Sequence, residues 1–137
     1  MSNELQTIVG LDPGRDKCGI AVMQGKSKVL YHQVIDSVQA IATIKQLTQK
    51  YAVDRIVMGN GTTSKSWQQQ IESNLSTVPV FTVDEKNSTL EARDRYWAMY
   101  PSQGFQRLLP QGLRVPPRPI DDIVAILLIE KYLRQSS

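Results

Sequence analysis

The sequence predicts one α/β domain, residues 1–137, built around a mixed sheet of five strands. Three observations support this prediction. The length of 137 residues suits one domain and leaves little room for two. Hydrophobic residues make up 41% of the chain and charged residues 21%, which is typical of a folded globular protein. Three strand-like segments come first and helices then alternate with two more, an order that indicates a sheet antiparallel at one edge and parallel at the other.

The predicted strands are short apolar segments. Thr7 to Asp12 is an apolar run that ends in Asp-Pro-Gly, which indicates a buried strand entering a turn. Gly19 to Met23 and Lys28 to Val34 are expected to pair as a hairpin through the Gln-Gly-Lys-Ser segment between them. Arg55 to Met58 and Val80 to Val83 are two further strands.

Four segments carry helix signals. Apolar residues follow a helical period between Asp36 and Tyr51, and again from Trp67 to Leu75. Ser88-Thr-Leu-Glu91 fits a capping box, so a third helix is predicted from Ser88 to Met99. A loop rich in proline and glycine follows, and the last helix is predicted to begin near Asp121.

Charge is unevenly distributed along the chain, although the net value is only +3. Between Lys86 and Arg118 there are six basic residues and two acidic ones. Such a local excess indicates an anionic partner, with nucleic acid as the leading candidate. A solvated basic face is the alternative on charge alone.

Several classes of protein are excluded by what the sequence lacks. Cys18 is the only cysteine and His32 the only histidine, which excludes a disulfide framework and a Cys/His zinc cluster. The longest apolar run, Ile123 to Ile129, is too short for a membrane span. The first residues have no basic and apolar pattern of a signal peptide, so we expect a cytoplasmic protein without a membrane partner. Nothing in the sequence indicates the oligomeric state.

Three acidic residues fall at the ends of predicted elements: Asp12 after the first strand, Glu85 after the fifth, and Asp122 in the last helix. Each has a structural interpretation as a turn residue, a solvated strand end or a helix cap, the cap being worth about 1 kcal/mol. However, strand ends in a mixed sheet gather along one edge, where three carboxylates would repel one another. Divalent cations would relieve that repulsion, because Mg²⁺ prefers carboxylate and water oxygens. Two ions about 4 Å apart can activate a water against a phosphodiester.

Three motifs, in order along the chain, resemble those of the YqgF (RuvX) proteins. The segment from Asp12 to Val22, Asp-Pro-Gly-Arg-Asp-Lys-Cys-Gly-Ile-Ala-Val, resembles the family's opening motif D-x-G-x-K-R-x-G-x-A. Asp84 to Ala92 is similar to the motif D-E-R-x-S/T-T-x-x-A, and Asp122-Ile-Val-Ala125 resembles D-x-x-A at the start of the last helix. The resemblance extends from Ile8 to Leu133, nearly the whole chain.

The resemblance implies an RNase H-like fold, shared with the RuvC Holliday-junction resolvases: three antiparallel and two parallel strands, with helices on both faces. It implies a metal-dependent nuclease that hydrolyses phosphodiester bonds in structured nucleic acid with Mg²⁺ or Mn²⁺, expected as two ions. Processing of ribosomal RNA precursors is favoured over cleavage of branched DNA. A module that binds nucleic acid without cutting it, in transcription or ribosome assembly, is the alternative class.

The resemblance also assigns residues. Asp12, Glu85 and Asp122 are expected to be catalytic and to hold the metals, with Asp12 contacting both ions and Asp84 and Asp121 in reserve. Contacts to nucleic acid are expected from Lys17, Asn60, Lys65, Lys86, Arg93, Arg114 and Arg118. Two departures from the family pattern affect substrate geometry more than metal binding. Gly59-Asn60-Gly61 lacks the usual proline, and Lys86 replaces an arginine whose planar fork suits a phosphate better.

Some features fit other functions less well. Gly59 to Ser66 matches a phosphate-binding loop except that Ser64 replaces the second glycine, so a nucleotide-dependent switch is disfavoured. The amides of that segment can instead hold one backbone phosphate or simply cap a helix. His32 is expected to be a structural histidine and Cys18 a small buried hydrophobe. Aromatic residues between Trp67 and Tyr100 can stack on bases, although their helical spacing favours core packing for at least two.

Overall fold

The computed structural model describes residues 6–101, 104–110 and 113–136. The strands are β1 (Thr7–Asp12), β2 (Lys17–Gln24), β3 (Lys28–Asp36), β4 (Arg55–Gly59) and β5 (Val80–Val83). The α-helices are α1 (Ala40–Tyr51), α2 (Ser64–Asn74), α3 (Ser88–Met99) and α4 (Asp121–Ser136). Two short 3-10 helices, η2 (Ser37–Gln39) and η3 (Gly104–Leu108), complete the described elements.

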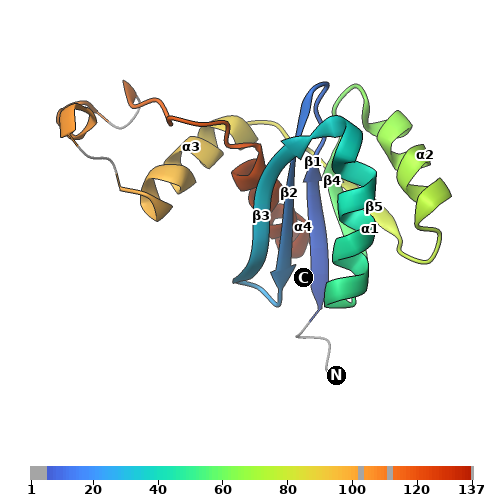
Figure 1. Cartoon of the computed structure of the whole chain (residues 1–137). Helices are drawn as coiled ribbons and strands as arrows, with labels where there is room; N and C mark the ends of the chain where they lie inside the picture. The colour runs from blue at the N-terminus through green and yellow to red at the C-terminus, as the bar shows by residue number, and fades with distance from the viewer. Residues whose placement is uncertain (1–5, 102–103, 111–112, 137) are drawn as a thin grey trace.

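The five strands form one sheet in the order β3-β2-β1-β4-β5 (Figure 1). β1 pairs antiparallel with β2, and β2 with β3, while β1 and β4 and then β4 and β5 run parallel. β1 is the central strand and is buried on both faces, which explains its continuous apolar run. The predicted mixed sheet and its division into antiparallel and parallel parts are confirmed.

Helices cover both faces of the sheet, as predicted (Figure 1). On one face, Ile20 and Val22 of β2 pack with residues of α1 and α2 around Ile44. On the other face, Ala21 and Met23 of the same strand pack against the buried side of α4. This alternation along β2 follows from the two-residue period of a strand. Cys18 is fully buried on the α1 face, in agreement with its expected role as a small hydrophobe.

The predicted start of the first helix and the predicted cap of the third are wrong. The first helix was expected from Asp36, but β3 continues through Asp36 and α1 begins only at Ala40. Ser37 holds this corner, because its amide donates to Asp16 O and its hydroxyl to Gly14 O. The capping box at Ser88 is also absent. The N-cap of α3 is Asn87, with φ +67° and no side-chain hydrogen bond to the helix.

A long arm extends from the sheet beyond the edge formed by β3 (Figure 1). It consists of α3, η3 and the described parts of the segment that leads back to α4. Apolar side chains are exposed along it, including Tyr100 and Leu108. Among the described residues, no helix is both long and apolar enough to cross a bilayer.

Candidate active site

Three carboxylates gather where the central strand ends. Asp12 closes β1, Glu85 follows β5, and Asp121 opens α4. The pKa of Asp12 is raised from 3.8 to about 7, first by burial and then by the negative charges of Asp121 and Glu85. The pKa of Asp121 is raised as well, first by burial and then by the charge of Asp122. Asp12 therefore lies in a cluster of like charges that a cation would stabilise.

Glycines on the neighbouring strands allow the other two acids to approach Asp12. Gly19 lies opposite Asp12 in the β1–β2 register, and a Cβ there would overlap the backbone carbonyl of Asp121. On the other side, a Cβ at Gly59, the last residue of β4, would overlap the carboxylate of Glu85. The strands on both sides of β1 thus leave space above the sheet, and the start of α4 and Glu85 occupy it.

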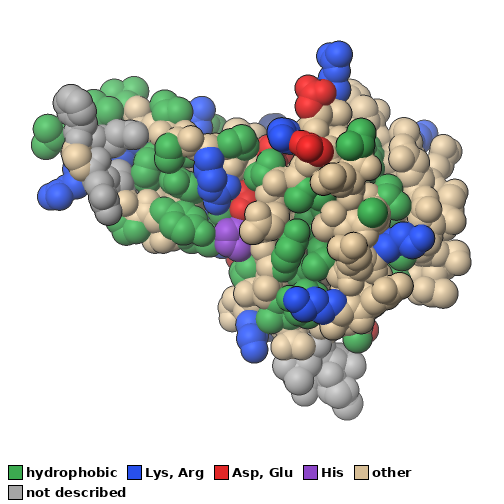
Figure 2. All heavy atoms as spheres, viewed as in Figure 1, with side chains coloured by type: hydrophobic (Ala, Val, Ile, Leu, Met, Phe, Trp, Pro, Cys, Tyr) green, Lys and Arg blue, Asp and Glu red, His purple; other side chains and the backbone are tan. Residues whose placement is uncertain are grey.

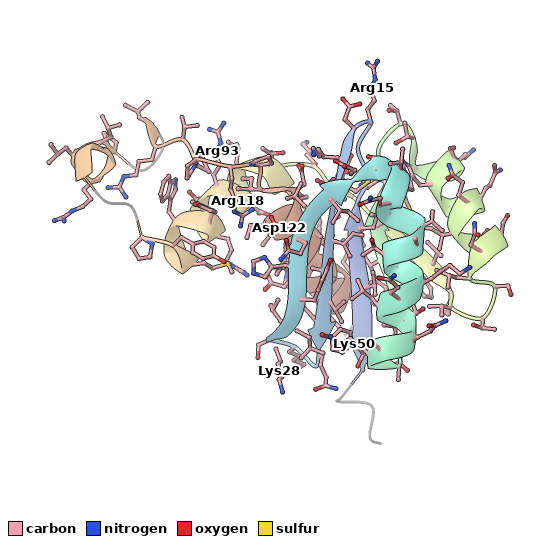
Figure 3. All side chains as sticks on the ribbon, viewed as in Figure 1. Arg15, Lys28, Lys50, Arg93, Arg118 and Asp122 are labelled. Atoms are coloured by element: carbon pink, nitrogen blue, oxygen red, sulfur yellow. The ribbon has the colours of Figure 1, made fainter. Side chains whose placement is uncertain are left out.

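Asp122, predicted as the third metal ligand, is not part of this cluster. It is 2% exposed, and both of its carboxylate oxygens have partners. Oδ2 lies 2.6 Å from His32 Nδ1 and Oδ1 accepts a hydrogen bond from Arg118 Nη1 at 2.9 Å (Figure 3). Burial alone would raise the pKa of Asp122, but the hydrogen bonds from Arg118 and His32, together with the charge of Arg118, outweigh burial and lower it.

The structure thus brings Asp121, which had been held in reserve, rather than Asp122 into the cluster with Asp12 and Glu85. Successive residues of an α-helix point about 100° apart, so the two aspartates of the first turn of α4 face different partners. Asp121 is near Asp12, and Asp122 is bonded to β3 through His32. The other reserve ligand, Asp84, belongs to a turn: its Oδ1 accepts from the amide of Lys86, and it is exposed.

The glycine-rich segment after β4 positions Glu85 rather than a nucleotide. Gly61, like Gly59, lies against the Glu85 carboxylate, where a Cβ would come within 2.5 Å of Oε2. Asn60 Oδ1 accepts from the amide of Glu85 at 3.4 Å, and the Asn60 amide donates to Val83 O. Asn60 thus helps to hold Glu85, and its predicted contact with a phosphate stays a prediction.

The basic residues predicted to contact nucleic acid differ in their exposure and in their ion pairs. Lys65, at the start of α2, and Lys86, beside Glu85, are exposed, and Arg93 of α3 is half-buried. Lys17 is exposed too, but its Nζ lies 2.6 Å from Asp36 Oδ1. That pair is on the surface and its strength is correspondingly small.

The two arginines of the loop before α4 are bonded within the protein. Arg114 donates to Leu109 O and Arg107 O, which folds the loop on itself. Arg118 is held by Asp122 and lies over the ring of Tyr96. Both were predicted to contact phosphates. Without nucleic acid each has a partner within the protein, and the phosphate contacts stay a prediction.

Two residues near the acids were missed by sequence reasoning. Arg15 is exposed at the tip of the β1–β2 loop, three residues after Asp12 (Figure 3). Its place in a short loop between the strand end that carries Asp12 and the next strand was a usable signal. His32 was assigned a structural role far from the site, but it contacts Asp122, next to Asp121. No sequence signal connects it with a residue 90 positions away.

The donor set fits divalent cations, since all three members of the cluster are carboxylates. Within residues 6–101, 104–110 and 113–136, no three His, Cys, Asp or Glu side chains stand close enough to hold one ion together.

The raised pKa of Asp12 predicts how stability depends on pH when metal is absent. The folded protein holds this proton more tightly than the unfolded chain, whose aspartate has the ordinary value of 3.8. The free energy of unfolding should therefore fall as pH rises from about 4 to about 7, by on the order of 3 kcal/mol between pH 5 and 8. The lowered pKa of Asp122 acts below pH 4 and lies outside this window.

Calorimetry in chelator between pH 5 and 8 measures this effect, and Asp12→Asn is the control because it cannot ionise. The wild-type midpoint should fall across the range while the midpoint of the variant changes much less. Parallel curves for the two proteins would contradict the raised pKa.

The sequence of this chain is similar to a known protein family over its first two thirds. The Tex protein YqgF-like domain family matches residues 6–92, which include Asp12 and Glu85 and end before α4. The Bacillus subtilis (strain 168) protein YdcI, described as uncharacterized, is 32% identical over 82 residues. That match covers 54% of this chain and 11% of YdcI, so the chain spans only about a tenth of that relative's length.

Among solved structures, the RuvC structure of Thermus thermophilus superimposes with a TM-score of 0.59 at 16% identity, over 96% of this chain and 98% of RuvC. The same RuvC in complex with a Holliday junction substrate gives a TM-score of 0.55, over 95% and 96% of the two chains. The match includes α4, so the whole RNase H-like fold is shared with RuvC. Since the family match covers more than half of its residues, the chain belongs to the family of Tex protein YqgF-like domains.

Proposed function

We propose that this domain binds structured nucleic acid across the end of β1 and hydrolyses its phosphodiester bonds with Mg²⁺ or Mn²⁺. The observation that carries the proposal is the cluster of Asp12, Glu85 and Asp121, in which burial and like charges raise the pKa of Asp12 to about 7. A structural carboxylate would be paired with a cation or with hydrogen-bond donors, as Asp122 is. Unpaired like charges at a strand end indicate a site for cations and phosphate.

Asp12, Glu85 and Asp121 would hold the ions, Asp12 from the centre and the other two from either side. When bound, such ions lower the pKa of a coordinated water and neutralise the leaving oxygen of a phosphodiester. The protein keeps these acids in place through the close contacts at Gly19 and Gly59. Because Asp12 must be ionised to bind cations, metal affinity should increase with pH up to about 7.

The nucleic-acid strand would contact the exposed basic side chains around this edge of the sheet. Arg15 lies in the loop after β1, Lys65 begins α2, and Lys86 follows Glu85 directly. Each of these side chains is exposed, so each can contact a phosphate without first breaking one of the hydrogen bonds described above.

Ribosomal RNA precursors are the first candidate substrate, because the YqgF proteins that this chain resembles are chiefly associated with RNA maturation. The likeness to RuvC, which was solved with a Holliday junction, supports branched DNA as the second candidate. The decisive experiment incubates pure protein with end-labelled structured RNA and with four-way DNA junctions, with manganese and with chelator. Cleavage of one substrate that depends on metal is expected, and intact substrates throughout would contradict the hydrolase proposal.

A domain that binds nucleic acid without cutting it, in transcription or ribosome assembly, is the second candidate function. The spread of the acids favours it, since the described residues include no group of three such ligands around one point. It predicts that the protein binds RNA or junctions in chelator and leaves them uncut in manganese.

Either function predicts that the affinity for nucleic acid falls as the salt concentration rises. Binding of the protein releases counterions from the phosphates of the nucleic acid, and added salt opposes that release. Arg15→Ala and Lys86→Ala should each flatten the plot of log affinity against log salt by about one unit. Lys28→Ala is the matched control, because Lys28 is exposed at the opposite end of the sheet (Figure 3). The slopes are measured by fluorescence anisotropy in chelator. A slope that changes with Lys28 and not with Arg15 or Lys86 would place the strand elsewhere.

A further inference from the structure

A polar pocket of about 300 Å³ lies beside the acid cluster, on the arm side of the molecule. Its walls are β3 from His32 to Val34, Tyr100 at the end of α3, Arg118 of the loop before α4, and Asp122. In Figure 2 the single histidine is visible in the notch between the arm and the body, with basic side chains above it. The pocket is thus open to solvent on the face that carries the proposed site.

The charges in this pocket are already paired. Arg118 and Asp122 form a salt bridge at 2.9 Å, and His32 holds the second oxygen of the same carboxylate. A phosphate would have to compete with Asp122 for Arg118. A neutral ligand with hydrogen-bonding edges would not, so the charge balance favours a neutral group.

The pocket also offers flat surfaces. The Arg118 guanidinium lies 5.4 Å from the ring centre of Tyr96 and 5.9 Å from that of Tyr100. The centres of these two tyrosine rings are 5.1 Å apart, so the rings are in contact with each other, and Tyr100 is 41% exposed. Tyrosine rings and guanidinium planes are the side-chain surfaces on which unpaired bases stack.

His32 supplies a hydrogen-bonding group with a defined role. The ionised carboxylate of Asp122 only accepts hydrogen bonds, so Nδ1 of His32 is the donor in their contact. In the neutral ring this leaves Nε2 as an acceptor, which suits the exocyclic amino group of a base.

The position relative to the acids agrees with a substrate subsite. Val34 lies opposite Gly19, and Gly19 opposite Asp12, so the pocket wall and Asp12 are two strand spacings apart. Two spacings correspond to about 10 Å. In addition, Asp122 of the pocket and Asp121 of the acid cluster are adjacent residues of α4.

We propose that this pocket binds one unpaired nucleobase of the nucleic-acid strand whose phosphate lies at Asp12, Glu85 and Asp121. The base would stack on Tyr100 and Arg118, and its exocyclic amino group would donate a hydrogen bond to Nε2 of His32. This subsite rests on the proposed function, because it requires that the acid edge binds nucleic acid.

Binding of single-stranded oligonucleotides to the whole protein in chelator tests the subsite without cleavage. The oligonucleotides carry one 2-aminopurine, whose fluorescence is quenched by stacking, or one abasic site, each moved stepwise along the strand. Tyr100→Ala should weaken binding by about five- to a hundredfold and abolish the quenching. Phe81→Ala is the matched control: Phe81 is 39% exposed on β5, at the opposite edge of the sheet, and both signals should stay within about twofold of wild type.

With the wild-type protein, an abasic site at one position of the oligonucleotide should lower the affinity by the same factor as Tyr100→Ala. The two changes together should lower the affinity little more than either one alone. This second measurement needs no variant to fold. If wild type binds and neither the abasic series nor Tyr100→Ala changes affinity, the subsite is wrong and the proposed function stands. If no oligonucleotide, structured RNA or junction binds wild type at all, both proposals are wrong.

Discussion

Asp12→Asn is expected to abolish metal-dependent cleavage, with a loss of at least about a hundredfold, while the protein stays folded. Asp12 is the central acid of the cluster, so neutral asparagine removes the one ligand that both ions would share. Without metal the same change should raise the thermal midpoint by about 5 to 10 °C, because an ionised Asp12 is destabilised by burial and by its acidic neighbours.

Calorimetry with chelator and again with millimolar manganese separates metal binding from structure. Wild type should gain stability in manganese, since the ions bind only the folded state, and Asp12→Asn should not. Asp16→Asn is the matched control, because Asp16 is an exposed acid in the same loop and it holds Ser37 through its backbone carbonyl rather than its carboxylate. If Asp12 is only a turn residue, asparagine suits the turn equally well and the manganese shift of Asp12→Asn will equal that of wild type.

Much of the fold was predictable because its elements carry strong local signals. Thr7–Asp12 and Val80–Val83 have the predicted bounds, since each apolar run is interrupted by polar or proline residues at its ends. The helix from Ser88 to Met99 was also placed correctly, although its predicted cap was wrong. That helix begins instead after Asn87, whose backbone is left-handed, and after a turn in which the Ser88 amide donates to Glu85 O. The carboxylate of Glu85 lies against Gly59 of β4.

The site was only partly predictable, because its details depend on contacts between distant residues. The positions of Asp12 and Glu85 follow from topology, since strand ends of one sheet meet at one edge. The choice between Asp121 and Asp122 does not. It depends on a bond from Asp122 to His32 across 90 residues of sequence, and on Arg118 turning inward rather than toward solvent.

Asp121→Asn and Asp122→Asn are therefore expected to have opposite effects, although the residues are neighbours. Asp121→Asn should abolish cleavage and the manganese-dependent shift, and should leave the metal-free midpoint unchanged or higher, because burial and Asp122 already disfavour its charge. Asp122→Asn should retain the manganese shift. It should lower the midpoint, because asparagine lacks the charge that pairs with Arg118.

Asp122→Ala extends the comparison, since alanine leaves Arg118 and His32, which are 36% and 23% exposed, without their shared partner. The expected loss is about 1 to 2 kcal/mol of unfolding free energy, or roughly 5 °C in midpoint, and more than the loss from Asp122→Asn. Alanine at position 121 should cost much less, since the Asp121 charge is destabilised by its surroundings. All four variants are compared by calorimetry in chelator and manganese and by cleavage of the same labelled substrate. If Asp122→Asn loses the manganese shift and Asp121→Asn keeps it, the third ligand is Asp122 and its bonds to His32 and Arg118 must open when metal binds.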